Sequence, residues 1–118
     1  MLLVSFPLHA HEMTPTYPKL VPSHMSNVYK TRMEMFNKRD DVEYYEIGVF
    51  DNEWKPIPFV SKFSVYRIEY LGHVEFDVYI RESDVERALY VCSISKLRKA
   101  SEVRQTISSR ICSKFRRE

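Results

Sequence analysis

Alternation of apolar and polar residues predicts a strand at 42–50, where Tyr45, Ile47 and Val49 share one face. The segment before it, 26–39, fits two patterns. The spacing of Tyr29, Met33 and Phe36 favours a helix, but the same segment also alternates as a strand would. We take the helix as the expectation for this segment and keep the strand as its alternative.

Two further alternating segments, 63–71 and 73–81, meet at Gly72 and predict a β-hairpin. A three-residue loop around this glycine sets Ile68 opposite Phe76 on the buried face. On the other face the same register pairs Arg67 with Asp77.

The C-terminal segment carries apolar residues at every fourth position, which predicts a helix that packs on the sheet. Ser101 is placed to cap this helix, and its stripe consists of Val103, Ile107, Ile111 and Phe115. Between it and the hairpin, the sequence from Ser83 to Glu86 forms a capping box, followed by the β-forming residues 89–94. Residues 89–94 fit a helix and a strand about equally.

Four prolines and three of the four histidines fall within residues 1–25, so we expect a flexible tail or leader there. Residues 26–118 then form a single domain. The predicted fold class is α+β: a small, mainly antiparallel sheet of three or four strands. The C-terminal helix, and possibly an N-terminal one, packs on that sheet.

Composition excludes several classes of protein. The chain has 118 residues, 44% of them hydrophobic and 29% charged, which is typical of one globular domain. With only two glycines it cannot build the phosphate-binding loops of nucleotide-binding proteins. Cys92 and Cys112 are its only cysteines, and such a sparse pair predicts two reduced thiols. Residues 1–11 lack the basic region and the cleavage site of a secretory signal, which predicts a cytoplasmic location.

Charge is distributed unevenly along the chain. Residues 96–118 hold eight Lys or Arg against two acidic residues, whereas residues 1–95 hold ten against fourteen. On the predicted C-terminal helix a basic ridge would face phosphates, and it consists of Arg104, Arg110, Lys114 and Arg117. The leading hypothesis is therefore a small regulatory protein that binds nucleic acid or a nucleoprotein complex. A solvated helix face is the alternative reading of the same charges.

The second hypothesis is a protein inhibitor or adaptor. It would bind through the acidic face of the strands and through the proline-stiffened segment 54–59. In that segment Trp54, Ile57 and Phe59 are the candidate contacts, because large side chains on a stiff chain lose little entropy on binding.

We expect no catalytic activity, cofactor or metal. The pairs Asp51 with Glu53 and Glu75 with Asp77 are the only candidate acid–base groups, and both are readily explained as solvated or ion-paired carboxylates. Cysteines and histidines do not share the spacing of a zinc site.

Overall fold

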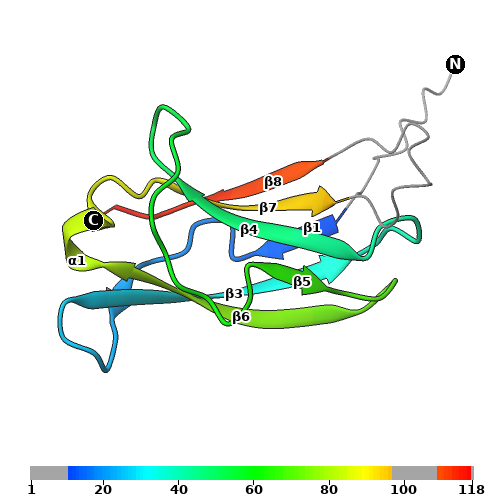
Figure 1. The fold of residues 1–118 in the computed structure, drawn as a ribbon, viewed down its shortest axis with the longest axis horizontal. Coiled ribbons are helices and arrows are strands. Elements are labelled where there is room, and N and C mark those ends of the chain that lie inside the picture. The colour runs from blue at the N-terminus through cyan, green and yellow to red at the C-terminus, as the bar shows by residue number, and fades with distance from the viewer. Residues whose placement is uncertain (1–10, 97–108, 118) are drawn as a thin grey trace, which may run out of the picture.

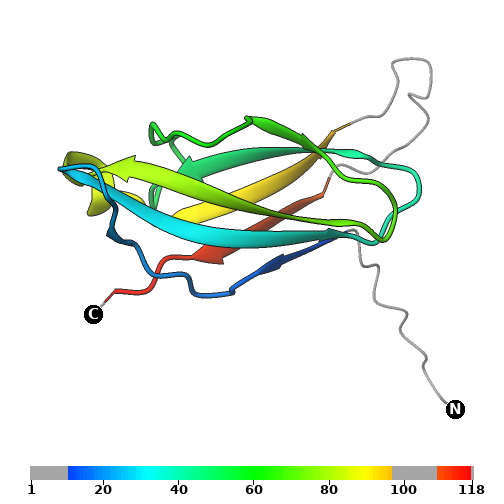
Figure 2. The same cartoon turned by 90° about the horizontal axis from the view of Figure 1, so that it is seen from below.

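The computed structural model describes residues 11–96 and 109–117, which form two antiparallel sheets packed face to face (Figures 1 and 2). One sheet is built on β3 (Val28–Asn37), with β6 (His73–Arg81) on one side and β1 (His11–Thr14) and β2 (Val21–Pro22) on the other. In the second sheet the order is β5 (Val65–Arg67), β4 (Tyr44–Phe50), β7 (Tyr90–Lys96) and β8 (Arg110–Lys114). A four-residue helix, α1 (Glu82–Val85), follows β6.

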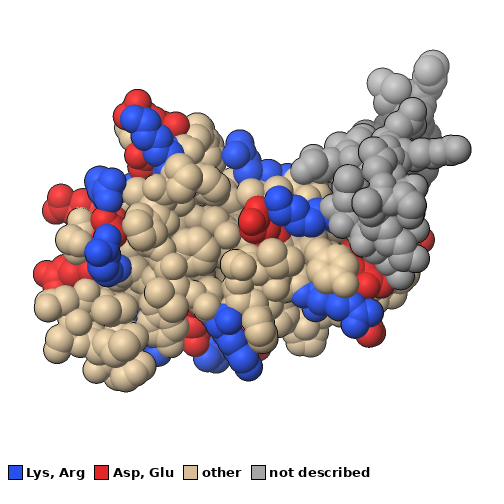
Figure 3. All heavy atoms as spheres, viewed as in Figure 1, with Lys and Arg blue, Asp and Glu red and all other residues tan. Residues whose placement is uncertain are grey.

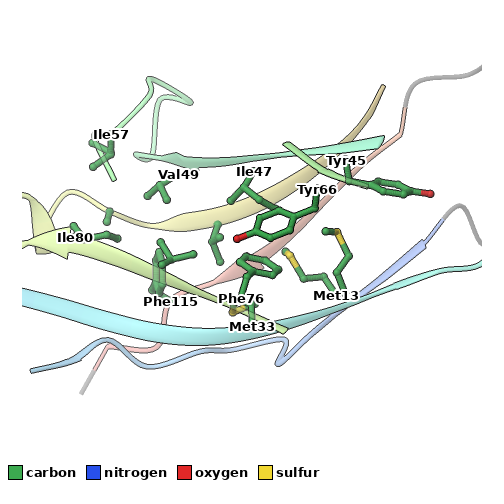
Figure 4. Packing of buried hydrophobic residues seen from close by; sticks show 14 of the residues in the cluster. Met13, Met33, Tyr45, Ile47, Val49, Ile57, Tyr66, Phe76, Ile80 and Phe115 are labelled. Atoms are coloured by element: carbon green, nitrogen blue, oxygen red, sulfur yellow. The ribbon is translucent and has the colours of Figure 1, made fainter. Parts of the chain in front are cut away.

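The hydrophobic core lies between the two sheets. Alternate residues of β4 and β7 face alternate residues of β3 and β6, and Figure 4 shows Ile47 and Tyr66 lying against Phe76 and Met33. The rings of Tyr66 and Phe76 are 5.2 Å apart between centroids, which joins the two layers. This architecture is a β-sandwich, and it corrects the predicted α+β class.

Residues 28–37 form strand β3 instead of the predicted helix. Its inward residues Thr31, Met33 and Met35 are buried, while Arg32 between them is exposed. The strand alternative was therefore correct. Pairing with β6 over nine residues favours the strand over the helix, because a strand at the centre of a sheet gains hydrogen bonds on both sides.

The predicted C-terminal helix is also wrong where the structure describes it. Residues 110–114 form strand β8, and residues 101–108 lie outside the described part of the chain. A spacing of four residues satisfies the two-residue period of a strand as well, so Ile111 and Phe115 still point into the sandwich. The segment 89–94, which fitted both patterns, lies in strand β7 from Tyr90 onward.

The predicted hairpin does not form, because its two strands belong to different sheets. Strand β5 pairs with β4 and β6 pairs with β3, so Arg67 does not pair with Asp77. Ile68 and Phe76 are nevertheless both buried in the core.

The segment before Ser26 contributes to the sandwich. Strand β1 pairs with β3 and places Met13 in the core. Beyond it the chain crosses toward the second sheet, where the N–H groups of Lys114 and Arg116 donate to the carbonyls of Thr16 and Pro18. Residues 16–18 thus run parallel to the end of β8 and connect the two sheets.

The cysteines are joined, which corrects the prediction of reduced thiols. Cys92 on β7 and Cys112 on β8 stand directly opposite each other and form a disulfide bond. Residues 51–53 form a turn after β4, in which the Asp51 carboxylate accepts the backbone N–H groups of Glu53 and Lys55.

Candidate functional site

The residues of the predicted basic ridge do not share a helix face. Arg110 and Lys114 lie on strand β8, and Arg104 lies outside the described residues. Arg117 donates to the backbone carbonyls of Val85 and Glu86, which caps the end of α1. On the face seen in Figure 3, Lys and Arg are scattered among Asp and Glu and form no continuous basic surface.

The three apolar residues predicted at 54–59 have different environments. Ile57 belongs to the core, and its N–H donates to the carbonyl of Val49. Phe59 is half-buried against the same core. Trp54 is 43% exposed and adopts a left-handed backbone conformation with φ of 64°. The structure therefore does not bring these side chains together on one surface.

Trp54 instead meets a residue of the predicted basic ridge. Its ring stacks on Tyr90 at 4.4 Å between centroids, and the Arg110 guanidinium lies 4.6 Å from the indole centroid. Tyr90 and Arg110 stand on either side of the Cys92–Cys112 pair along strands β7 and β8. The Trp54 ring contacts both Tyr90 and Arg110 and therefore lies across the disulfide. Cys92 is fully buried, although its side chain points away from the core between the sheets.

A groove of about 890 Å³ lies between β5 and β6, the facing edges of the two sheets. Its apolar wall includes Val60, Phe63 and Val65, which are 67%, 53% and 40% exposed. Phe76 and Tyr66 form its floor.

The loop that lines this groove is held in place by hydrogen bonds. The Tyr66 hydroxyl lies 2.8 Å from Ser61 Oγ and accepts the backbone N–H of Phe63 at 3.4 Å. The ring of Phe63 also meets that of Tyr66 edge-on, at 5.5 Å between centroids. The exposed apolar side chains therefore belong to an anchored wall.

One side of strand β6 is open along this groove. Tyr79 exchanges both backbone hydrogen bonds with Val60, at 2.8 and 2.9 Å, so its N–H and C=O point away from β3. Because the strand repeats every two residues, the N–H and C=O groups of Asp77 and Glu75 point the same way. Within residues 11–96 and 109–117, no other strand pairs with this stretch of β6.

The outer face of the first sheet is acidic beside this open edge. Glu34 on β3 stands directly opposite Glu75 on β6, and Asp77 follows two residues later. Arg32 contacts both β6 carboxylates, with its Nε 3.1 Å from Asp77 and its Nη1 3.5 Å from Glu75. These carboxylates match the acidic strand face inferred from the sequence, although Arg32 and not Arg67 is the partner of Asp77.

A second polar cluster lies inside the sandwich near β1. His11 is buried with its Nε2 2.7 Å from Ser93 Oγ and its ring 4.6 Å from that of Tyr45. Burial lowers the pKa of His11 to about 4, and the nearby charge of Arg39 acts in the same direction. The Tyr45 hydroxyl donates to the Asn37 side chain, and burial raises the pKa of this tyrosine to about 12. Both groups are neutral at pH 7 and join strands of the two sheets.

Nowhere in the described ranges do three or more His, Cys, Asp or Glu side chains gather as metal ligands would. No helix of the described chain is long and apolar enough to cross a membrane.

The sequence matches no protein-family model and no curated protein. The fold, however, resembles solved structures. The Escherichia coli chaperone DraB superposes with a TM-score of 0.64 at 13% identity, over 89% of this chain and 52% of that one. A structure of the Salmonella enterica SafA pilin in complex with the SafB chaperone gives a TM-score of 0.60 at 12% identity, over 94% and 55%.

A smaller domain matches along nearly its whole length. The PapD-like domain 7 of human CEP192 gives a TM-score of 0.53 at 9% identity, with 97% of this chain and 92% of that one covered. The chain thus spans about half the length of the chaperone structures it matches. At these identities the likeness establishes a PapD-like, immunoglobulin-like β-sandwich.

These findings overturn the leading hypothesis drawn from the sequence. The basic helix on which a nucleic-acid or nucleoprotein partner depended is absent at 110–117, and the similar folds include chaperones and a chaperone–pilin complex. The disulfide contradicts the expected reduced thiols and the cytoplasmic location, because disulfides are rare in the cytosol. The periplasmic chaperone SfaE also superposes on this chain, with a TM-score of 0.57 at 15% identity over 90% of this chain and 56% of that one.

Proposed function

We propose that this chain is a non-catalytic protein-binding domain, which captures an extended segment of another protein as an added strand on the free edge of β6. The observation that carries the proposal is the combination of unpaired backbone groups at Glu75 and Asp77 with an apolar groove directly beside them. Strand addition uses these two features together, since backbone hydrogen bonds supply affinity and side-chain pockets supply specificity.

The exposed surface beside the free edge supports such a partner. A free edge is normally protected by charged residues, a bulge or a covering loop, because it pairs readily with other chains. Here Val60 covers β6 at Tyr79, and the loop then turns away to β5. An added segment would bury Phe63 and Val65 and would continue the sheet where Val60 leaves it.

The comparisons support a polypeptide as the ligand. DraB and SfaE are described as chaperones, and SafB is a chaperone in complex with a pilin. Proteins of this architecture therefore include several that handle other polypeptides. Because the present chain spans about half of each chaperone, the comparison supports protein binding as a general mode and leaves the partner to be found by experiment.

We also propose an oxidising compartment, such as a periplasm or the cell exterior, as the site of action. Disulfides form and persist in such compartments and are rare in the cytosol. Intact mass measured under native and reducing conditions tests this point. A two-hydrogen difference between the native and reduced forms supports it, and a fully reduced protein from its natural source contradicts it.

Selection of a phage-displayed library of random peptides tests the binding mode, with the disulfide-intact protein as bait. Glu75→Pro removes the outward N–H and leaves the bonds to β3 intact, since residue 75 does not donate to β3. We expect selected peptides to bind the parent and Asn52→Pro, a matched proline in an exposed turn, and to lose affinity for Glu75→Pro.

Amide hydrogen exchange then locates the bound peptide. Protection of the Glu75 and Asp77 N–H groups supports the proposal, and protection confined to β1 or β8 contradicts it. Phe63→Asp changes an exposed side chain and therefore serves as a second variant if Glu75→Pro does not fold. Unchanged peptide binding by this folded variant also contradicts the proposal.

A further inference from the structure

We infer the direction and the side-chain pattern of the captured segment: it runs antiparallel to β6 and alternates apolar residues with lysine or arginine. This inference rests on the proposed function and adds the chemistry of the partner. It follows from three features of the groove: the bridge at Val60, the two-sided pleat of β6 and the acidic outer face.

The bridge at Val60 sets the direction. Val60 and Tyr79 form an antiparallel pair, so residues leading to Val60 already run opposite to β6. The added segment takes over this path where the chain leaves it, with its N-terminal end near Tyr79 and its C-terminal end near His73. Antiparallel pairing is also the more stable geometry for each residue added.

The pleat of β6 sets the alternation. Residues directly opposite each other on neighbouring strands point to the same face of the sheet. Positions opposite Phe76 and Val74 therefore point into the groove, between the two sheets, where Phe63 and Val65 lie. Positions opposite Asp77 and Glu75 point to the outer face.

The outer face sets the charge. Two carboxylates, from Glu75 and Asp77, share the guanidinium of Arg32. A third carboxylate, from Glu34, stands on β3 directly opposite Glu75, with the His73 Nε2 atom 4.0 Å away. Glu34 and Glu75 carry like charges directly opposite each other, which is unfavourable. A further cation beside them would reduce this repulsion. Arg32 reaches the β6 carboxylates from the β3 side, so a cation on the added strand reaches them from the free side.

Synthetic peptides test this inference directly. We compare a blocked Val-Lys-Val-Lys-Val peptide with Val-Glu-Val-Glu-Val, which presents the same apolar face. In 50 mM salt we expect the cationic peptide to bind about tenfold more tightly, because each of two exposed positions exchanges an attraction for a repulsion. The preference should shrink as salt is added.

Charge reversal locates the preference on β6. The double variant E75K/D77K should lose the preference for lysine or invert it. E53K/E69K changes the net charge equally at exposed sites off the groove and should keep the parent's preference. A preference that survives E75K/D77K, or is equally lost in E53K/E69K, overturns the inference.

Direction is read from nitroxide labels at either end of the peptide. A label at the N-terminus should broaden the amide resonances around Val60 and Tyr79, and a C-terminal label should broaden those around His73. The reverse pattern overturns the antiparallel assignment. Peptides that bind at the β6 edge with no preference for cations refute this inference alone, whereas failure of every peptide at that edge refutes the proposed function as well.

Discussion

The buried His11 makes the stability of the sandwich depend on pH. Its pKa is about 4 in the folded protein, against 6.5 in an unfolded chain. Between these values the unfolded state binds a proton that the folded state excludes, so the free energy of unfolding falls as pH decreases. Each unit of difference corresponds to 1.36 kcal/mol, which gives a loss of about 3 kcal/mol between pH 7 and pH 4.

Urea unfolding of the disulfide-intact protein at several pH values measures this loss. His11→Gln keeps an amide that can bond Ser93 and removes the titration, so its stability should depend less on pH between 6.5 and 4. His73→Gln is the matched control, because it replaces an exposed histidine of β6 by the same residue and leaves His11 in place. Carboxylates such as Asp41, whose pKa is lowered mainly by Arg39, lose their contribution as the pH falls further in all three proteins.

Two results would refute the reasoning. One is a pair of parallel stability curves for the parent and His11→Gln across this pH range. The other is an NMR titration in which the His11 ring protonates near pH 6.5 in the folded state. Either would mean that the imidazole is hydrated, and that burial between the sheets does not set its pKa.

Three further predictions concern the disulfide and the core. Replacing Cys92 and Cys112 by Ala should lower stability by about 3 kcal/mol in urea unfolding, the value for a loop with the observed separation of 20 residues. Phe76→Ala should cost about 3–5 kcal/mol by thermal or urea unfolding, while the exposed Tyr70→Ala stays within about 0.5 kcal/mol of the parent. Trp54→Ala should speed reduction of the disulfide by dithiothreitol, and an unchanged rate would show that the indole does not shield it.

The sequence predicts the local parts of this fold. Strand β4 follows from alternation alone, and the turn at Asp51 follows from a carboxylate that can bond its own backbone. Both depend on neighbours within a few residues. The identities of β3 and β8 depend instead on partners about 45 and 20 residues away, with which they pair across a sheet. A period of four residues cannot separate a helix from a strand without that knowledge.

The candidate site is harder to predict for the same reason. The acidic face at Glu75 and Asp77 is visible in the sequence, because both residues fall on one side of an alternating segment. The groove beside it is not, since its two walls come from β5 and β6, which the hairpin model placed in one sheet. Arg110 and Trp54 were assigned to rival hypotheses, and only the three-dimensional structure reveals their contact.

The parallel contact between residues 16–18 and the end of β8 gives the domain mechanical strength. Tension applied at His11 and at Arg117 pulls the two segments past each other, in opposite directions along their length. The hydrogen bonds from Lys114 to Thr16 and from Arg116 to Pro18 are then loaded in shear, so both resist the force at the same time. Strands that are peeled apart from one end break their hydrogen bonds one after another. Within β8 the pull reaches the disulfide at Cys112, which ties that strand covalently to β7. A domain pulled from these two ends should therefore resist extension until residues 16–18 detach.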